Sequence, residues 1–339
     1  MTDTKAAMLT ETQGPVDEAE RGRDAAAPHD IPPLGLKDVV WRVFYAIFED
    51  RISLIAAGVT FFMLLAFFPS MALLATIYGF FSDPVAIASQ VGFLSDFLPP
   101  GAMALITDQL QGLSSQKNST LSFAFASSFA LARWSSSSGV KALFDAMNVA
   151  YGEAESRSIL KLNAVALAFT LVATLLATLL IVSVGIIPVV LAFLRLDGWL
   201  ELLARILRWP LALIVMCGMI MLVYRFGPSR EPAKLRWITW GAAVSAILWT
   251  IATLGFSYYL SHFADYNATY GALGTLIGVM IWVWISVMIL ILGAEINAEL
   301  EHQTLRDSTT GAPKPMGDRG AFVADTVGRK AENLEAGIR

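Results

Sequence analysis

The chain has 339 residues, of which 56% are hydrophobic and only 15% are charged. Soluble globular domains usually carry about 25% charged residues, so much of this surface is expected to face something other than water. The formal net charge of −4 excludes the basic footprint of a nucleic-acid-binding protein, and we therefore predict no nucleic-acid partner.

The two ends of the chain differ in composition from the rest. Residues 1–33 are polar, acidic and rich in Ala, Pro and Glu, without the apolar stretch of a secretory signal. Residues 303–339 combine Gly and Pro with charges of both signs. Such compositions are typical of disordered chain, so we predict two disordered tails around one domain at residues 34–302.

Long uncharged runs fill this domain, and several are long enough to cross about 30 Å of hydrocarbon as helices. We therefore predict an all-α fold, a polytopic bundle of six transmembrane helices, with a kink at Pro69 in the first. The second span is the weakest and is included because its neighbours require an even number of crossings. The predicted spans are residues 52–82, 118–140, 162–188, 206–225, 237–261 and 270–294.

Two further segments have the spacing of amphipathic helices, and we expect both to lie at the membrane surface. Between the first and second spans, Met103, Ile106, Leu110 and Leu113 recur at intervals of three and four residues. A similar stripe occupies residues 200–207, just before the fourth span.

Lysine and arginine counts in the short loops predict the orientation. The loops expected on the cytoplasmic side contain Lys37, Arg42, Arg51, Lys141, Arg157, Lys161, Arg225, Arg230, Lys234 and Arg236. The opposite loops contain Lys117, Arg195, Arg205 and Arg208. Because the first set of loops contains more Lys and Arg residues than the second, we predict that both termini lie in the cytoplasm.

Residue types needed for catalysis are sparse. The three histidines, His29, His262 and His302, are far apart in sequence and on both sides of the predicted membrane, so they cannot assemble a metal site. The serine run at 135–138 lacks a Gly-x-Ser-x-Gly setting and is better explained by close helix packing. We predict that the protein is not an enzyme and binds no metal and no cofactor.

Four segments together resemble the YihY/BrkB family of bacterial inner-membrane proteins, which has also carried the label ribonuclease BN. They are AAGVTFFMLLAFFPSMALL (56–74), WSSSSGVKALFDAMNVAYGEAESR (134–157), YRFGPSR (224–230) and YNATYGALGTLIGVMIWVWISVMILILGAEINAE (266–299). The resemblance implies six helices in the bacterial inner membrane with both ends cytoplasmic. A ribonuclease is not expected, because the histidines cannot meet and the cytoplasmic loops are too short for a nuclease domain.

Ionisable residues at membrane depth are costly and point to function. Arg133 and Glu295 are expected at similar depth in the inner third of the membrane. We hypothesise that they face the bundle interior, as a pair or around a polar cavity, with Asn297 close by. The alternative is that each lies in the headgroup layer with a water or lipid partner.

Two more groups of residues are candidate sites. Asn148, Tyr151 and Glu155 share one helical face and, with Arg157, could form a cytoplasmic gate or headgroup clamp, the alternative being an ordinary solvated interface. At the opposite face of the membrane lie Asn267, Tyr270, Gly271 and Gly274. There, aromatic residues typically anchor a helix at the interface, and glycines allow close helix contact within the fold or between copies.

These observations leave three functions open. The favoured one is a transporter or flippase-like translocator of a lipid or another amphiphile, with membrane lipids as partners. The second is a non-catalytic scaffold for envelope enzymes, with the tails as handles. The third, a membrane-bound hydrolase, lacks a catalytic constellation.

Overall fold

The computed structural model describes residues 15–79, 138–172, 198–262 and 273–336, with the single positions 103, 107 and 175. These residues form helices and connecting segments without a strand, apart from one isolated bridge between Ala233 and Thr309. The predicted all-α fold is therefore confirmed for the described part of the chain.

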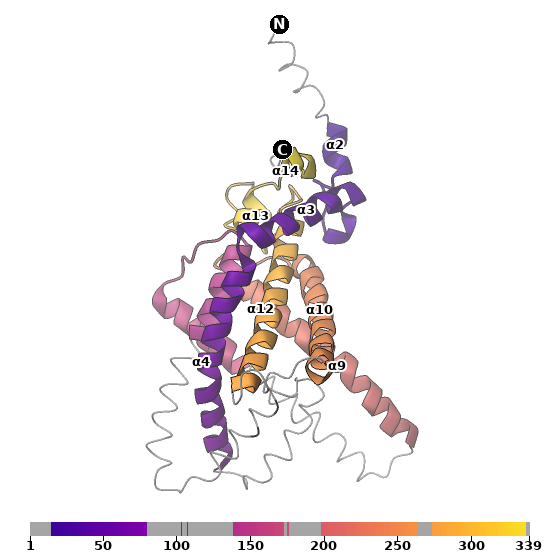
Figure 1. Ribbon diagram of the computed structural model, residues 1–339. Coiled ribbons are helices and arrows are strands. Elements are labelled where there is room, and N and C mark those ends of the chain that lie inside the picture. The colour runs from indigo at the N-terminus through magenta and orange to yellow at the C-terminus, as the bar shows by residue number, and fades with distance from the viewer. Residues whose placement is uncertain are drawn as a thin grey trace.

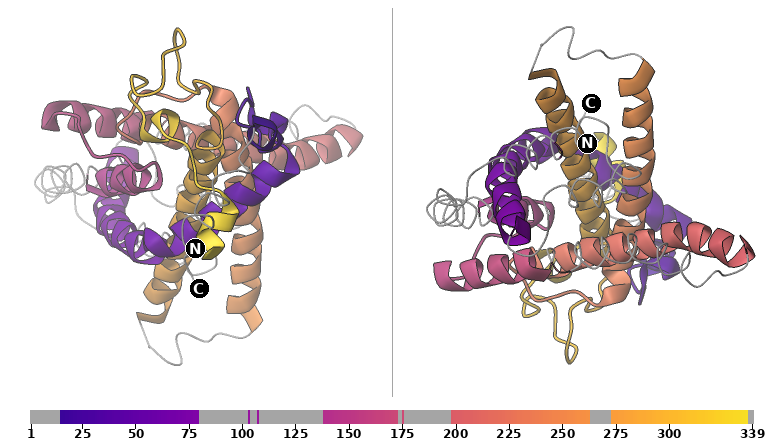
Figure 2. Two further views of the ribbon diagram at one scale, coloured as in Figure 1. Left: turned by 90° about the horizontal axis from the view of Figure 1, so that it is seen from above. Right: turned by 90° about the horizontal axis from the view of Figure 1, so that it is seen from below.

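The central feature is a bundle of long helices (Figures 1 and 2). Its labelled members are α4 (Ile52–Gly79), α9 (Gly198–Phe226), α10 (Leu235–His262) and α12 (Gly274–Glu301). Two further helices, 138–150 and Ile159–Val172, lie beside them. α12 is the hub, because it packs against both α10 and α4, while α9 packs against α10.

The helices of the bundle are apolar enough to sit in a membrane. α10 and α12 each have 28 residues, which at 1.5 Å per residue gives about 42 Å, more than the hydrocarbon thickness. Shorter apolar helices occupy Ile52–Ala66, Ile159–Val172 and Leu213–Phe226. α10 and α12 therefore have the length and composition of membrane-crossing helices, and the count of six crossings stays a prediction.

Large apolar side chains point outward from these helices, as expected for a surface that faces lipid rather than water. They include Leu54, Phe61 and Leu65 on α4, Ile214 on α9, and Ile247, Ile251 and Leu254 on α10.

Helix boundaries follow the predicted spans closely in two places and depart from them in others. α4 begins at Ile52, as predicted, and α10 exceeds the predicted 237–261 by two residues and one. α12 continues to Glu301, a further two turns. The surface stripe at 200–207 and the fourth span form one continuous helix through Pro210. Most of the second span lies outside the described residues, and so do Ile106, Leu110 and Leu113 of the surface stripe before it.

Both predicted disordered tails are folded over most of their described length, which corrects the sequence prediction. Residues 18–31 and 302–336, called here the polar cap, pack together at one end of the bundle (Figure 1). The cap contains the end of α2 (Pro15–Glu20), then η1 (Pro28–Asp30), α13 (Phe322–Asp325) and α14 (Ala331–Ala336). Residues 1–14 and 337–339 lie outside the described part.

Hydrogen bonds between the two chain ends explain why the cap folds. The Gln303 side chain donates to the Arg21 carbonyl at 2.8 Å, and the Leu305 amide donates to the Arg23 carbonyl at 2.7 Å. Small apolar side chains from both segments, such as Ala25 and Ala324, are buried between them. Each segment alone has too little apolar surface to fold. Contacts between the two segments bury additional surface, and the composition of either segment alone does not reveal these contacts.

Candidate functional site

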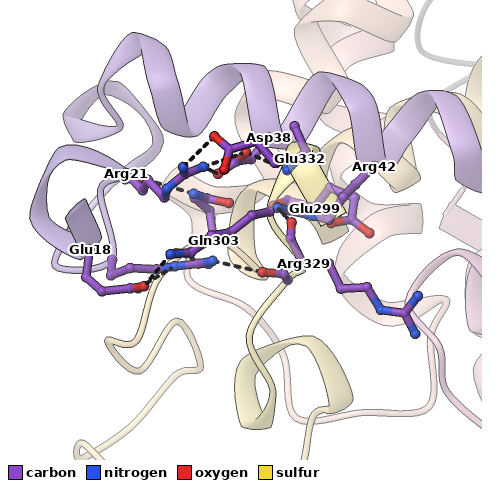
Figure 3. A network of polar contacts seen from close by, with 12 residues as sticks. Glu18, Arg21, Asp38, Arg42, Glu299, Gln303, Arg329 and Glu332 are labelled. Atoms are coloured by element: carbon purple, nitrogen blue, oxygen red, sulfur yellow. Dashed lines mark hydrogen bonds and ion pairs between the residues drawn. The ribbon is translucent and has the colours of Figure 1, made fainter. Parts of the chain in front are cut away.

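The junction between the bundle and the polar cap holds most of the buried charge of the described residues. Helix α3 (Pro33–Glu49) lies across this junction and contributes Asp38 and Arg42 (Figure 3). The Arg21 guanidinium donates to both carboxylate oxygens of Asp38 at 3.0 Å, with both side chains buried. The same Asp38 also accepts from the Ala331 amide at 2.8 Å. One carboxylate thereby ties α3 to both ends of the chain.

Arg42 makes the second link from α3. Its guanidinium pairs with the Glu299 carboxylate of α12 and donates to the Glu299 carbonyl at 2.9 Å and to the Arg329 carbonyl at 2.9 Å. Each of the three guanidinium nitrogens therefore donates to an acceptor within the protein, which uses three of its five N–H groups. Arg42 therefore fastens the cap and α3 to the last turns of α12.

On another face of α12, Glu301 and Arg230 form a fully buried ion pair at 2.7 Å. The Ser308 hydroxyl donates to the same carboxylate at 2.8 Å. The Arg230 guanidinium also lies over the Tyr151 ring, 5.0 Å from its centroid. This arrangement joins the 226–234 connection to α12 and to the end of helix 138–150.

Three of the four predicted cytoplasmic-face residues meet in one cluster. The Glu155 carboxylate accepts from Arg157 at 2.6 Å and 2.8 Å, and the Asn148 amide donates to it at 3.2 Å. Arg157 then donates to the Gly227 carbonyl at 2.8 Å. Asn148 accepts from the Ser229 amide at 2.7 Å. Tyr151 takes no part in these hydrogen bonds, and its ring lies under the Arg230 guanidinium. The cluster therefore clamps helix 138–150 to the connection between α9 and α10.

The Arg157 hydrogen bonds lower the pKa of Glu155 to about 2, from an ordinary value of 4.5. A carboxyl group whose pKa is depressed in the folded state stabilises the fold above its ordinary pKa, and the contribution is lost as pH falls through the folded value. We expect the Glu155→Gln variant to melt below the wild type at pH 5 to 7, with the gap closing between about pH 4.5 and 2. Melting curves of both proteins across this range test it, and a gap that stays constant down to pH 2 contradicts it.

Asn297, predicted to lie near an intramembrane site, joins α12 to α10. Its side-chain oxygen accepts from the Gly241 amide at 2.8 Å, and its amide donates to the Ile238 carbonyl at 3.2 Å. One turn further into the bundle, Tyr224 of α9 donates to the Leu290 carbonyl at 2.7 Å and contacts the Ser245 hydroxyl at 2.8 Å. These contacts hold α9, α10 and α12 together through buried polar groups.

Glu295 differs from the other buried acids because no cation pairs with it in the described residues. Its side chain is 2% exposed, and its Oε1 atom has no hydrogen-bond partner among the residues that the structure describes. Among the described residues, the acids that interact with it are Asp50, which follows the last residue of α3, and Glu299, and the Asp50 carboxyl group is placed to share a hydrogen bond with it. Burial raises the pKa of Asp50. Because two carboxyl groups can share a hydrogen bond only when one is protonated, this pair is equipped to hold a proton or to receive a donor from a ligand.

Of the other predicted site residues, only Gly274 lies in the described part of the chain. Arg133, Asn267, Tyr270 and Gly271 lie outside the described residues, so the hypothesised pairing of Arg133 with Glu295 stays a prediction. Gly274 begins α12 and is buried.

Sequence reasoning missed Asp50, Asp38, Glu301 and the pairing roles of Arg42 and Arg230. A sequence signal existed for Asp50, because the charged run Glu49, Asp50 and Arg51 directly before a long uncharged run marks a membrane boundary. The partners of the others come from distant parts of the chain, and no local pattern indicates them.

Among the described residues, no three His, Cys, Asp or Glu side chains gather closely enough to hold a metal ion. His302 contacts the Thr326 hydroxyl at 2.9 Å within the polar cap. His262 ends α10, about 40 Å along the helix from its first residue, by the rise of 1.5 Å per residue.

Comparisons with known proteins agree with the architecture. The model of the family described as "Virulence factor BrkB" matches residues 43–317. The ribonuclease-like protein YfkH of Bacillus subtilis (strain 168) is 31% identical over 251 residues, covering 72% of this chain and 88% of that protein. No solved structure matches the chain significantly.

Proposed function

We infer a function from the premise that this chain belongs to the virulence factor BrkB family. We propose that the protein is a transporter or flippase-like translocator that moves a lipid or another amphiphile across the bacterial inner membrane. The proposal extends to a multi-pass arrangement with both termini in the cytoplasm and with membrane lipids as partners.

The observation that carries the proposal is the Glu295 carboxyl group. An ionisable side chain in a membrane helix is costly unless it is paired, and such residues commonly mark substrate or proton pathways. Glu295 is buried, its Oε1 has no hydrogen-bond partner among the described residues, and the charged groups that interact with it there are other acids, Asp50 first among them. If position 295 served packing alone, an apolar residue would be more stable there. We therefore attribute the energetic cost of burying the Glu295 carboxyl group to a function.

The chemistry of this pair suits one class of substrate. Two acids in a protected site favour a headgroup that presents hydrogen-bond donors or a cationic group, such as an ammonium or hydroxyl group. The outward faces of α4 and α10 are apolar and match acyl chains. A polar site beside a lipid-facing surface suits a molecule that has both a polar headgroup and acyl chains.

The proposed orientation is supported by the positions of basic residues. Arg225, Arg230, Lys234 and Arg236 lie in or beside the connection between α9 and α10. This connection contacts the polar cap through Glu231, whose amide donates to the Gly320 carbonyl at 3.0 Å. A bundle end rich in Arg and Lys is the end that stays in the cytoplasm.

The alternatives have less support. The scaffold hypothesis used the tails as free handles, but most of their described length is folded into the polar cap. The name of the Bacillus subtilis relative describes that protein as ribonuclease-like. For the present chain we keep the prediction of no enzymatic activity, which is supported by the separation of His262 from His302 along the bundle.

Transbilayer movement in proteoliposomes tests the role of the acid pair. Purified protein would be reconstituted with a fluorescent lipid, and dithionite would report how fast inner-leaflet label reaches the outside. We expect Glu295→Gln and Asp50→Asn to slow this movement several-fold, because each removes one member of the pair while keeping its shape.

The matched control is Glu49→Gln, which neutralises the exposed acid next to Asp50 and should leave the rate unchanged. Equal rates for the wild type and both pair variants, with all proteins folded, would remove Glu295 from the pathway. Equal slowing by all three variants would point to loss of surface charge instead.

A further inference from the structure

Helix α3 presents two chemically opposite faces. Gly35, Asp38, Val39, Arg42 and Val43 are buried toward the polar cap and α12. The other face exposes Leu36, Val40, Phe44 and Phe48, spaced four residues apart, with Val40 66%, Phe44 50% and Phe48 65% exposed. Side chains at this spacing form one continuous stripe on a helix. The stripe is far too apolar for a face that meets water.

Aromatic rings extend this stripe. Trp41 stacks on Tyr45 with ring centroids 5.9 Å apart, and Phe44 meets Trp41, Tyr45 and Phe48 edge-on at 6.0, 5.9 and 5.3 Å. Trp and Tyr beside Phe are characteristic of the boundary between hydrocarbon and headgroups, where an apolar ring body and a polar tip are both satisfied.

The buried face fixes the orientation of the helix. The Arg21–Asp38 and Arg42–Glu299 ion pairs lie on the side opposite the stripe and hold α3 against the cap and α12. Rolling α3 to hide the aromatic stripe would expose these pairs and break both. The stripe is therefore held outward by the fold.

The chain then turns from α3 directly into a lipid-facing helix. Arg51, with a φ of 50°, separates α3 from α4, and Figure 1 shows α3 lying across the end of the bundle before the chain turns into α4. Leu54, in the first turn of α4, is also exposed. The apolar surface of α3 is thus continuous with that of a helix expected to cross the membrane.

We propose that α3 is an in-plane membrane helix, lying in the leaflet on the polar-cap side with Val40, Phe44 and Phe48 inserted among lipid acyl chains. The occupant of this face is the lipid of the host bilayer. The helix marks the boundary of the membrane: the polar cap lies on its aqueous side, and Asp50 lies at the level where the bundle enters lipid. This inference holds whatever the protein transports.

Depth measurements on single-cysteine variants test the proposal. Cys217, the only cysteine of the chain, is replaced by Ser, and Val40→Cys, Phe44→Cys or Phe48→Cys is added. Each variant is labelled with a nitroxide and reconstituted in vesicles of phosphatidylethanolamine and phosphatidylglycerol. Accessibility to oxygen, which concentrates in lipid, is compared with accessibility to a water-soluble nickel chelate. Met316→Cys, in an exposed loop of the polar cap, is the control.

We expect all three α3 labels to favour oxygen and to report a depth of about 5 to 10 Å below the headgroups, with the Met316 label favouring the nickel chelate. α3 labels as open to nickel as the control would overturn the proposal. Labels shielded from both reagents, with dipolar broadening between them, would show a second copy of the chain on this face and would also overturn it. Because three separate positions are labelled, misfolding of one variant leaves the test intact.

Discussion

Replacing Arg230 by Met should lower the stability of the protein by about 3 to 5 kcal/mol, the usual cost of leaving one member of a buried ion pair without its partner. Both side chains of the Arg230–Glu301 pair are almost completely buried. In the variant, the Ser308 hydroxyl is the one hydrogen-bond donor left to the Glu301 carboxylate among the described residues. Thermal unfolding in detergent, followed by circular dichroism, measures the loss.

The double variant Arg230→Met/Glu301→Met distinguishes a broken pair from lost packing. Replacing both charges with apolar side chains of similar size removes the uncompensated carboxylate, so the double variant should be more stable than Arg230→Met alone. A double variant whose loss equals the sum of the two single losses would mean that the two residues act independently.

The second large effect is expected where α10 and α12 touch at two glycines. A Cβ on Gly241 would come within 3.0 Å of the Gly293 carbonyl oxygen and of the Asn297 side chain. A Cβ on Gly293 would come equally close to Ser245, Tyr224 and the Gly241 carbonyl. Because backbone atoms fill the space, Gly241→Ala must push the helices apart and break the Asn297 bond to the Gly241 amide. We expect a loss of about 3 kcal/mol, the upper end for overpacking.

Gly255→Ala is the matched control, because Gly255 lies on the same helix and is exposed, and a methyl group added there would meet no described atom within 4 Å. Alanine favours a helix over glycine by up to about 1 kcal/mol, so this variant should be neutral or slightly stabilised. The stabilities of the two variants are compared by thermal unfolding in the same detergent. A Gly241→Ala protein as stable as the Gly255→Ala protein would show that the helices are not in close contact.

Much of the fold could be predicted from the sequence because a bilayer imposes simple requirements. A long uncharged run must be a helix in a membrane, and Ile52 to Gly79 and Leu235 to His262 bear this out to within a few residues. Packing contacts were harder to find. The sequence drew attention to Gly271 and Gly274, of which Gly271 lies outside the described residues, whereas the described close approach is at Gly241 and Gly293. The spacing of glycines does not say which face of a helix meets a neighbour.

The polar cap could not be predicted because it is built from contacts across almost the whole chain. Arg23 binds the carbonyls of Gln303 and Gly328, and Asp38 binds the Ala331 amide. Composition describes each end separately, and each end alone resembles disordered chain.

The candidate site was predictable in part. Glu295 stood out as an acid at the end of an apolar span, and its burial without a cation agrees with its being a special position. Its neighbour Asp50 comes from a different helix, and the proximity depends on how α3 lies across the bundle. Asn148, Glu155 and Arg157 do meet, but their hydrogen bonds go to each other and to the 226–234 connection, a clamp that helical spacing alone does not indicate.

The most direct measurement is the fraction of fluorescent lipid that stays protected from dithionite in vesicles containing the wild-type protein. A translocator exchanges label between leaflets, so the protected inner-leaflet signal should be lost while protein-free vesicles retain it. The loss should be strongest for lipids whose headgroups carry an ammonium or hydroxyl group. A protected fraction equal to that of protein-free vesicles, for every headgroup tested, would contradict a lipid-translocating function.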